Sequence, residues 1–345
     1  MVVLGADLHK RSHTIVVIDE TGRKLAEKTI SATAEGHLEL RRWAAQWPDR
    51  RWGLEECRHL SRRLDAELVR AGESVVRVSP KLMAGVRRST REPGKSDPID
   101  ALAVARAVLR EPDLPVATLD GPDRAVRLLI DHREDLVGER TRHEQRLRWV
   151  LVELAIAEPS PRSLGRALVQ TTLASVLAGR TEPVARFARD LLARIVELST
   201  TIRALEHEIE ILVRTLAPTL LALPGCGALT AAKIIGEAAG ISRFRSKEAF
   251  ARHNGTAPVP VWSGNVVRHR LNRGGNRQLN VALHRIAITQ IRLGGQGRTY
   301  LDHRQASGDT RTEAIRALRR RLSDEVFRRL RADEAAGSTG LAAAA

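Results

Sequence analysis

The first 110 residues alternate short apolar runs with amphipathic stretches, and this order limits the fold more than any other feature of the chain. Two apolar runs, 2–6 and 14–18, and a third strand-like segment, 24–31, come first and are joined by short polar turns. Runs of this length between turn residues are typical of β-strands in an antiparallel meander. Helical and strand patterns then alternate: helix 34–47, strand 51–54, helix 59–71, strand 74–78, helix 80–88 and a helix that begins near Asp97.

The resulting order, βββαβαβα, is that of a ribonuclease H-like fold with a mixed sheet. Side chains at neighbouring strand ends of such a sheet converge at one edge. Asp7 ends the first strand, which should be central, and Glu55 ends the strand expected beside it. Asp97 and Asp100 lie on a helix that should pack against the same edge. Glu56 is as good a candidate as Glu55 on chemistry alone.

Asp97 and Asp100 are three residues apart at the start of a helix, with Pro98 in its first turn. Their carboxylates therefore project from one side of that turn. Two capping acids that suit the helix dipole are the commoner explanation of such a pair. The alternative is half of a divalent-metal site. Together with Asp7 and Glu55, the pair offers four carboxylates of the kind that Mg²⁺ prefers, which favours the metal site.

Composition indicates an intracellular protein with a polyanionic partner. The 345 residues carry a net charge of +16, and only 3% of them are aromatic. Residues 241–331 hold 20 basic residues, 19 of them Arg, against six acids. Such a bias is typical of nucleic-acid binding. No apolar run approaches the roughly 20 residues that span a membrane, and Cys57 and Cys226 match no metal spacing. We therefore expect a cytoplasmic protein with reduced cysteines.

The middle of the chain is predicted to be helical. Residues 119–154 form a long amphipathic stretch, and a second stretch has apolar residues spaced alternately by three and four: Ile195, Leu198, Ile202, Leu205, Ile209, Leu212 and Leu216. This spacing predicts a heptad seam over about three repeats. The seam can pair within the chain, as a coiled coil or an ordinary two-helix hairpin, or between subunits.

Two motifs in the last third could act on nucleic acid. The segment 223–227, Leu-Pro-Gly-Cys-Gly, opens a helix that carries Lys233 and resembles a helix-hairpin-helix, which presents backbone N–H groups to phosphate. Ser263 precedes Gly264 in a predicted turn, where serine is usually only a turn residue. Basic side chains follow it closely: Arg268, His269, Arg270, Arg273 and Arg277. A hydroxyl among guanidinium groups could attack a phosphodiester.

These motifs together resemble the DEDD transposases of the bacterial IS110 group, recombinases guided by a bridge RNA. The resemblance covers residues 1–330 and lies in five segments: Gly5-Ala6-Asp7-Leu8-His9-Lys10, Leu54-Glu55-Glu56-Cys57, Lys95-Ser96-Asp97-Pro98-Ile99-Asp100-Ala101, Leu223-Pro224-Gly225-Cys226-Gly227, and Trp262-Ser263-Gly264-Asn265 with Arg273-Gly274-Gly275-Asn276. The acid set with a downstream Ser-Gly is specific to this family. The family has a small residue after its Glu; here Glu56 stands there, which aligns Glu55 with the family's acid.

The resemblance implies a RuvC-like domain over 1–115, a helical, coiled-coil connector over 116–217 and a mainly helical transposase domain over 218–332, before a disordered tail, 333–345. It implies that Asp7, Glu55, Asp97 and Asp100 hold Mg²⁺, and that Ser263 forms a covalent link to DNA. It also implies a bridge RNA as guide and a homo-oligomer, a dimer or tetramer, that shares its active sites between subunits. Lys233, Arg268, Arg270, Arg273 and Arg277 are the expected nucleic-acid contacts.

Three functions stay open at this point. The first is an RNA-guided, Mg²⁺-dependent DNA transposase that uses Ser263. The second is a RuvC-like nuclease that cuts DNA without a covalent step. The third is an inactive nucleic-acid-binding remnant of an insertion sequence. Replacing Ser263 with alanine separates the first two, since only the transposase would lose its cleavage.

Overall fold

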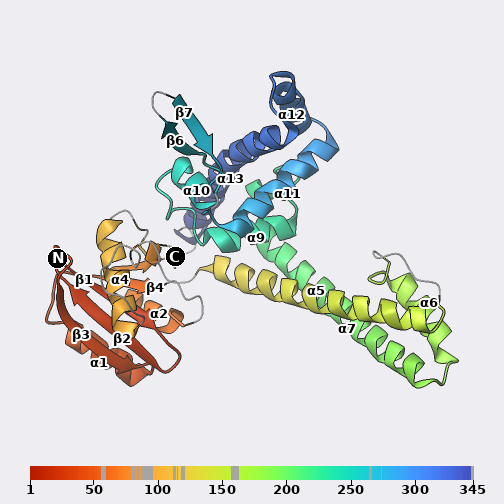
Figure 1. Ribbon diagram of the computed structural model, residues 1–345, viewed down its shortest axis with the longest axis horizontal. Helices are drawn as coiled ribbons and strands as arrows, with labels where there is room; N and C mark the ends of the chain where they lie inside the picture. The colour runs from red at the N-terminus through yellow and green to blue at the C-terminus, as the bar shows by residue number, and fades with distance from the viewer. Residues whose placement is uncertain are drawn as a thin grey trace. The chain divides into compact units, whose positions relative to one another are not determined.

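The computed structural model describes residues 1–55, 60–78, 82–83, 86, 96–111, 114, 116–117, 121–156, 163–263, 266–272 and 274–342. The chain forms two compact units, Met1–Asp120 and Gly121–Ala345, drawn in Figure 1. Among the described residues, none of the helices combines the length and the apolar character needed to cross a bilayer.

The first unit is built on a five-stranded mixed sheet in the order β3-β2-β1-β4-β5. Its strands are β1 (Val2–Leu8), β2 (Ser12–Ile18), β3 (Lys24–Ser31), β4 (Arg50–Glu55) and β5 (Val75–Val78). The first three strands pair antiparallel, whereas β4 lies parallel to β1 and β5 parallel to β4. This is the ribonuclease H-like topology predicted from the element order, with β1 in the centre.

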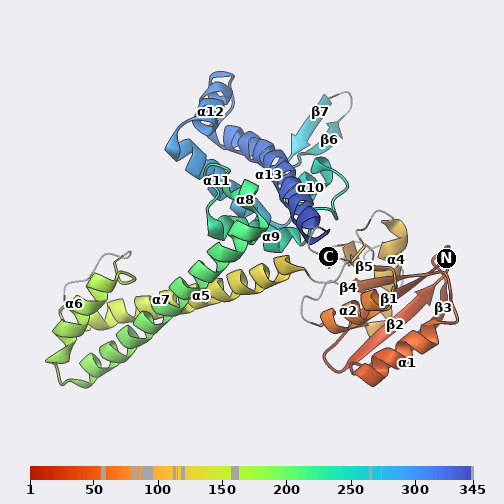
Figure 2. The ribbon, with the colours of Figure 1, turned by 180° about the vertical axis from the view of Figure 1, so that it is seen from behind.

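Helices cover both faces of this sheet, as Figures 1 and 2 show from opposite sides. On one face, α4 (Asp97–Arg110) packs on Val3, Val16 and Ile18. On the other, α1 (Ala34–Ala44) and α2 (Arg62–Arg70) cover the alternate residues of the same strands, and Trp52 is fully buried there. Because side chains alternate along a strand, each residue of β1 belongs to one face only.

Two glycines bring α4 unusually close to the sheet. Gly5 of β1 and Gly53 of β4 are partners in the parallel ladder. A Cβ added at Gly5 would lie 2.3 Å from the Ala101 carbonyl oxygen and 2.4 Å from the Ala105 nitrogen. One added at Gly53 would meet the Val108 side chain at 2.5 Å. Only the lack of side chains at these two positions therefore permits this packing.

A buried histidine pair lies on the α1 and α2 side of the sheet. His13 of β2 stacks on His37 of α1, with ring centroids 5.3 Å apart, and His37 Nδ1 lies 2.8 Å from a Glu67 carboxylate oxygen. Burial, together with the charge of His37, lowers the pKa of His13 to about 4. His13 therefore stays neutral in the folded protein at pH values where an unfolded histidine, with a pKa near 6.5, is protonated.

This difference predicts that the first unit loses stability as the pH falls. Below pH 6.5 the unfolded state takes up a proton that folded His13 takes up only near pH 4, so acid favours unfolding. Between pH 8 and pH 5 we expect a loss of about 2 kcal/mol from this residue. Urea unfolding of the full chain, followed by tryptophan fluorescence at both pH values, measures it. The variant His13→Phe should unfold with a clearly smaller pH dependence; an unchanged dependence would assign the effect to other groups.

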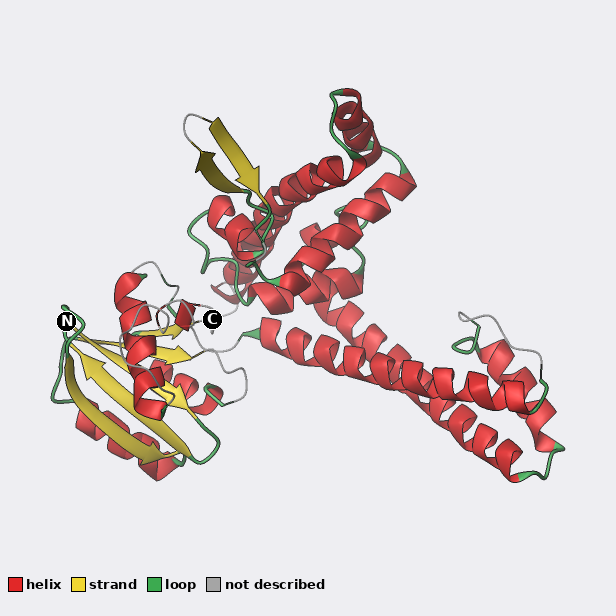
Figure 3. Cartoon of the chain, viewed as in Figure 1, coloured by secondary structure: helices red, strands yellow, loops and turns green. Residues whose placement is uncertain are grey.

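The second unit contains a long antiparallel helix pair, α5 (Pro122–Glu153) and α7 (Pro183–Leu216), with α6 (Ala167–Ala178) packed on α7 near the turn between them. Figure 3 shows the pair as two long rods. The predicted heptad seam of α7 faces α5: Ile195, Leu198, Ile202 and Ile209 are buried. An ion pair between Arg194 and Glu139, at 2.7 Å, also joins the two helices. The seam is therefore satisfied within one chain.

The rest of the unit is a helical cluster with one β-hairpin. It contains α8 (Pro218–Leu221), α9 (Ala228–Ala238), α10 (Lys247–His253), α11 (Arg277–Leu293), α12 (Gln296–Ala306), α13 (Arg311–Ala342) and the strands β6 (Val259–Ser263) and β7 (Val266–Arg270). A single apolar core joins α9, α11 and α13 to the near ends of α5 and α7. The predicted hairpin at 223–227 is the turn between α8 and α9, where Gly225 has φ +83° and packs against the Ile286 carbonyl.

Two sequence predictions need comment. A disordered tail was predicted from residue 333, but α13 continues to Ala342. Asp333 explains part of the difference, because its carboxylate accepts hydrogen bonds from the backbone N–H groups of Thr219 and Leu220 at the start of α8. The alanine-rich sequence beyond it also favours a helix. The helix predicted over 80–88 lies mostly outside the described residues, as does Cys57.

Candidate metal centre and nucleic-acid interface

Four carboxylates gather on the α4 side of the sheet, at the end where Asp7 lies. Asp7 follows Gly5 by two residues and Glu55 follows Gly53 by two, so both side chains belong to the face that α4 covers. The N-terminus of α4 supplies Asp97 and Asp100. Close packing at the two glycines thus determines how near the acids of α4 come to those of the strands. Glu56 lies outside the described residues.

Asp7 is at the centre of this group. It is only 4% exposed, and its Oδ2 atom is buried and accepts no hydrogen bond from the described residues. Burial is the main cause that raises the pKa of Asp7; the charges of Asp100, Glu55 and Asp97 raise it further, and His9 opposes them. The other three acids therefore lie within electrostatic reach of Asp7, and no lysine or arginine is among the groups that perturb it.

His9 is a member of this group that the sequence motifs contained without assigning it a role. Its Nε2 atom lies 3.2 Å from Asp7 Oδ2 and 3.3 Å from Asp97 Oδ1. Asp7, His9 and Asp97 offer ligand atoms that all lie within 4.8 Å of one another. The imidazole is half exposed, so it can turn away from the two carboxylates or ligate together with them. The sequence does contain a signal for His9: it follows Asp7 by two residues, and side chains two apart in an extended chain point to the same side.

Ser263 belongs to the second unit, as the last residue of β6. The hairpin pairs it with Val266 of β7, and the predicted turn residues Gly264 and Asn265 lie outside the described residues. Trp262, beside it, is 67% exposed. The structure thus presents the serine at the tip of a two-stranded hairpin, while the four acids belong to the other unit.

The predicted arginines are distributed along and below this hairpin. Arg268 and Arg270 lie in β7, opposite Val261 and Val259, and Arg270 is exposed. Arg277 is exposed at the first turn of α11. Arg273 lies outside the described residues. Arg270 of the hairpin and Arg277 of α11 are therefore the predicted contacts that the structure shows as exposed.

Two family models match this chain. One, described as a transposase of the DEDD type named for IS110, matches residues 4–156, which include all four acids. The other, described as the transposase IS116/IS110/IS902 family, matches residues 217–302, which include Ser263 and the hairpin. Both halves of the sequence motif thus fall within the two models, in the order expected. The chain belongs to the IS110 family of transposases.

Related proteins cover nearly the whole IS110-family chain. A 44.8 kDa protein of insertion element IS116 from Streptomyces clavuligerus is 27% identical over 95% of this chain and 94% of its own length. A 42 kDa protein of IS900 from Mycobacterium paratuberculosis is 24% identical over 95% of each chain. Among solved structures, the Thermus thermophilus RuvC in complex with a Holliday junction substrate matches 34% of this chain and 99% of its own, with 15% identity and a TM-score of 0.27.

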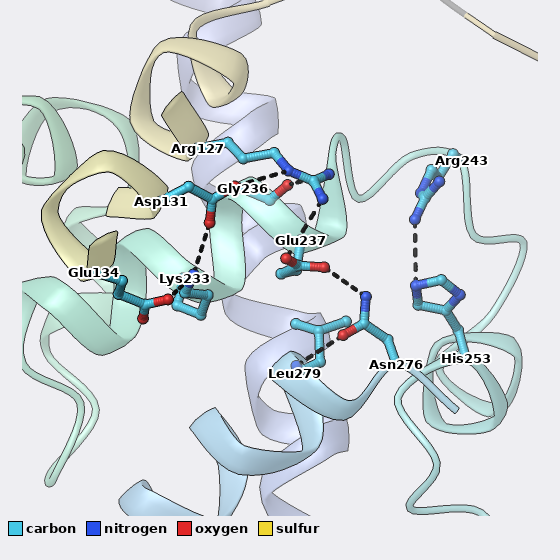
Figure 4. A network of polar contacts seen from close by, with 10 residues as sticks. All are labelled: Arg127, Asp131, Glu134, Lys233, Gly236, Glu237, Arg243, His253, Asn276 and Leu279. Carbon is cyan, nitrogen blue, oxygen red and sulfur yellow. Dashed lines mark hydrogen bonds and ion pairs between the residues drawn. The ribbon is translucent and has the colours of Figure 1, made fainter. Parts of the chain in front are cut away.

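Lys233 of this IS110-family chain is not placed as a nucleic-acid contact, contrary to the sequence prediction. It is 3% exposed, and its ammonium group donates to Asp131 and Glu134 of α5, at 2.8 Å each. Figure 4 shows these contacts. A buried ammonium is retained only when it is paired. Lys233 therefore joins α9 to α5, and we do not keep it among the proposed contacts to nucleic acid.

The same network holds the base of the serine hairpin. Buried Glu237 of α9 accepts a hydrogen bond from Asn276 at 2.6 Å, and Asn276 accepts one from the Leu279 N–H to cap α11. Beside it, a Cβ added at Gly275 would lie 2.2 Å from the Gly255 nitrogen. The motif Gly274-Gly275-Asn276 thus joins the segments before and after the hairpin, which explains these residue types in the family pattern.

Proposed function

We propose that this chain is a Mg²⁺-dependent DNA transposase that cleaves and rejoins DNA through a covalent bond to Ser263, guided by a structured noncoding RNA. The observation that carries the proposal is the gathering of Asp7, Glu55, Asp97 and Asp100 around one buried carboxylate that lacks a lysine or arginine partner. The match of the serine hairpin to a transposase family supports the second half of the proposal.

The donor set fits a divalent cation. Four carboxylates placed close together repel one another, and the buried Asp7 Oδ2 accepts no hydrogen bond among the described residues. Hard oxygen donors of this kind suit Mg²⁺ better than softer metals. We therefore propose Asp7, Glu55, Asp97 and Asp100 as its ligands. When bound, the cation would supply positive charge that stabilises the phosphate oxygens of the scissile group.

Ser263 would supply the nucleophile. Its oxygen forms a bond to phosphorus, the bond between phosphorus and the oxygen of the leaving strand breaks, and that oxygen gains the proton that the serine loses. Arg268, Arg270 and Arg277 would stabilise the negative charge that develops on phosphate. Because the serine ester conserves the energy of the phosphodiester bond, a second strand end can attack it and complete strand exchange.

We further propose that the predicted domains have separate roles: 1–115 holds the metal, 116–217 connects, and 218–332 supplies the serine. The acids and the serine lie in separate compact units, an arrangement suited to active sites shared between subunits of a dimer or tetramer. The net charge of +16 and the 19 arginines in 241–331 suit a protein that holds RNA and DNA by their backbones. Base pairing by the guide RNA would then provide sequence specificity.

Covalent trapping tests the proposal directly. The protein is incubated with the noncoding RNA encoded beside its gene, labelled donor and target DNA, and Mg²⁺, and a denaturing gel is run. We expect a protein-linked DNA band that Ser263→Ala and Asp97→Ala each abolish. If active sites are shared, a mixture of the two variants should recover part of the band, because each supplies the unit that the other lacks.

Other outcomes assign other functions. Cleaved DNA without an adduct, unchanged in Ser263→Ala but lost in Asp97→Ala, would contradict the serine step and identify a RuvC-like nuclease. Binding without cleavage by the wild type, in the presence of Mg²⁺ and the RNA, would identify an inactive remnant. If the adduct forms fully without RNA, only the proposed role of the noncoding RNA as guide is contradicted.

A further inference from the structure

A cavity of about 650 Å³ lies in the second unit between α11, α13 and the loop that follows β7. Helix α11 contributes Arg277, Asn280 and His284, and α13 contributes Ile315, Arg316 and Arg319. The loop adds Leu271, which comes directly after the hairpin that carries Ser263. None of the residues that line this cavity, all of them described, is an acid. We call it the α11–α13 cavity.

The arginines of this cavity differ from neighbouring arginines of α13 that are ion-paired. Elsewhere on α13, Arg320 pairs with Asp324, and Arg328 pairs with Glu325. Among the described residues, Arg277, Arg316 and Arg319 form no ion pair within 4.0 Å. Glu313, one turn before Arg316, is instead held by Thr310 at the start of α13. With no acid in its lining and no ion pair on its three arginines among the described residues, the cavity carries a positive charge.

The floor of the cavity is rigid. Arg319 donates to the Asn280 side chain at 2.8 Å, and Asn280 donates to the Asn254 carbonyl at 2.9 Å. Asn254 is fully buried and donates to Ser323 of α13 at 2.8 Å. The Arg319 Nε atom is buried and has no hydrogen-bond partner among the described residues. A fixed guanidinium with an unused donor favours binding of an anion without reorganisation.

The electrostatics agree with this geometry. Burial, and next the charge of Arg316, lowers the pKa of Arg319, so the two guanidinium groups are held close together at an energetic disadvantage. An anion between them would remove that repulsion. Burial and the charge of Arg319 also lower the pKa of His284, so its imidazole is neutral at pH 7 and can both donate and accept hydrogen bonds.

The lining residues also include apolar side chains, which indicates a ligand larger than a phosphate ion. Leu271 and Val281 are 48% and 45% exposed, and together with Ile315 they give the cavity an apolar side. The amides of Asn272 and Asn280 lie among the lining residues. A volume of this size holds a small molecule comfortably. Both amides already bond to the protein. The guanidinium groups and the apolar side therefore carry the match, to the phosphate and to the base face of a nucleotide.

We propose that the α11–α13 cavity binds one nucleotide of a single-stranded nucleic acid, with its phosphate on Arg277, Arg316 and Arg319 and its base against Leu271, Val281 and Ile315. The inference deepens the proposed function in its nucleic-acid partner, and it requires neither the metal nor the serine. Because the cavity wall begins at the residue after β7, a strand held there is anchored next to the serine hairpin.

Binding of fluorescein-labelled 12-nucleotide strands, DNA in one arm and RNA in the other, tests the proposal by anisotropy. The double variant Arg316→Gln/Arg319→Gln should bind its strand about 10-fold or more weakly. The slope of log K against log salt should fall by about 0.7, the value for one phosphate contact to a single strand. The matched control, Arg320→Gln/Arg328→Gln, removes the same charge from the same helix outside the cavity and should stay within about 2-fold.

Three further results would overturn the proposed nucleotide site. Equal weakening by the control pair would show diffuse attraction and overturn the site. An abasic strand that binds the wild type as tightly as the normal strand would overturn the nucleotide assignment. Ultraviolet cross-links of the bound strand should map to 271–284 or 312–319, and cross-links confined to other segments would contradict the proposal. The cavity and the proposed chemistry can fail separately. If the cavity variant binds its strand weakly but still forms the Ser263 adduct at saturating protein, the cavity proposal is supported and the serine chemistry does not depend on it. If the wild type forms no adduct but the cavity variant still weakens strand binding, only the proposed chemistry fails.

Discussion

The variant Asp7→Asn should lose its DNA cleavage by about 10³-fold or more and yet unfold at a higher temperature than the wild type when no metal is present. The two effects have one cause. Burial and three neighbouring acids raise the pKa of Asp7, so at neutral pH its ionised form is held at a disadvantage relative to the unfolded chain. Asparagine keeps the shape of the side chain and removes the charge. Thermal unfolding with and without Mg²⁺, beside a cleavage assay, measures both effects.

The metal response is the sharper part of this test. Wild-type protein at Mg²⁺ concentrations about 100-fold above Kd should gain about 2.7 kcal/mol of stability, and Asp7→Asn should lose most of that gain. Asp65→Asn is the matched control, since Asp65 is also buried but pairs with Arg77 at 2.6 Å. Burial raises the pKa of Asp65 as well, although Arg77 opposes it, so the control changes a similar buried acid. Because Asp65 belongs to α2 on the other face of the sheet, Asp65→Asn should keep its full Mg²⁺ response. A lower melting temperature in metal-free Asp7→Asn would show instead that Asp7 is a stabilising structural acid.

The order of strands and the four acids could be predicted because each depends on local sequence. Segments of four to eight residues bounded by turn residues identify the strands, and the resulting order leaves one plausible sheet. The acids follow from that sheet, because Asp7 and Glu55 stand at strand ends and the Asp97–Asp100 pair stands at a helix start. The position of each therefore follows from topology, and the structure brings the other three within electrostatic reach of Asp7.

Features that depend on distant partners could not be predicted. The sequence suggests that Lys233 is an exposed basic residue. In the structure it is buried and pairs with Asp131 and Glu134, about a hundred residues away in sequence. The α11–α13 cavity requires the crossing of two helices, so nothing in the spacing of Arg277, Arg316 and Arg319 indicates it. His9 was visible in the motif, but its place between two carboxylates depends on how α4 packs.

The variant Gly5→Ala tests that packing, and it should both destabilise the first unit and weaken its response to Mg²⁺. The added Cβ would lie 2.3 Å from the Ala101 carbonyl oxygen and 2.4 Å from the Ala105 nitrogen. Both are backbone atoms of α4, which cannot turn aside as a side chain can, so the helix must move away from β1 as a whole. We expect a loss of about 3 kcal/mol, measured by urea unfolding that is followed through tryptophan fluorescence; three of the chain's five tryptophans, Trp43, Trp47 and Trp52, lie in the first unit.

The second effect follows because the same movement carries Asp97 and Asp100 away from Asp7, so Mg²⁺ should raise the melting temperature less than in the wild type. Gly53→Ala is the graded control: its Cβ would meet the side chains of Val108 and Val104, which can shift, so both losses should be smaller. Gly179→Ala, which meets nothing within 4 Å, should change neither quantity. If Gly5→Ala kept a full Mg²⁺ response despite its lower stability, the strand acids alone would hold the metal, and α4 would act only as a cover for the sheet.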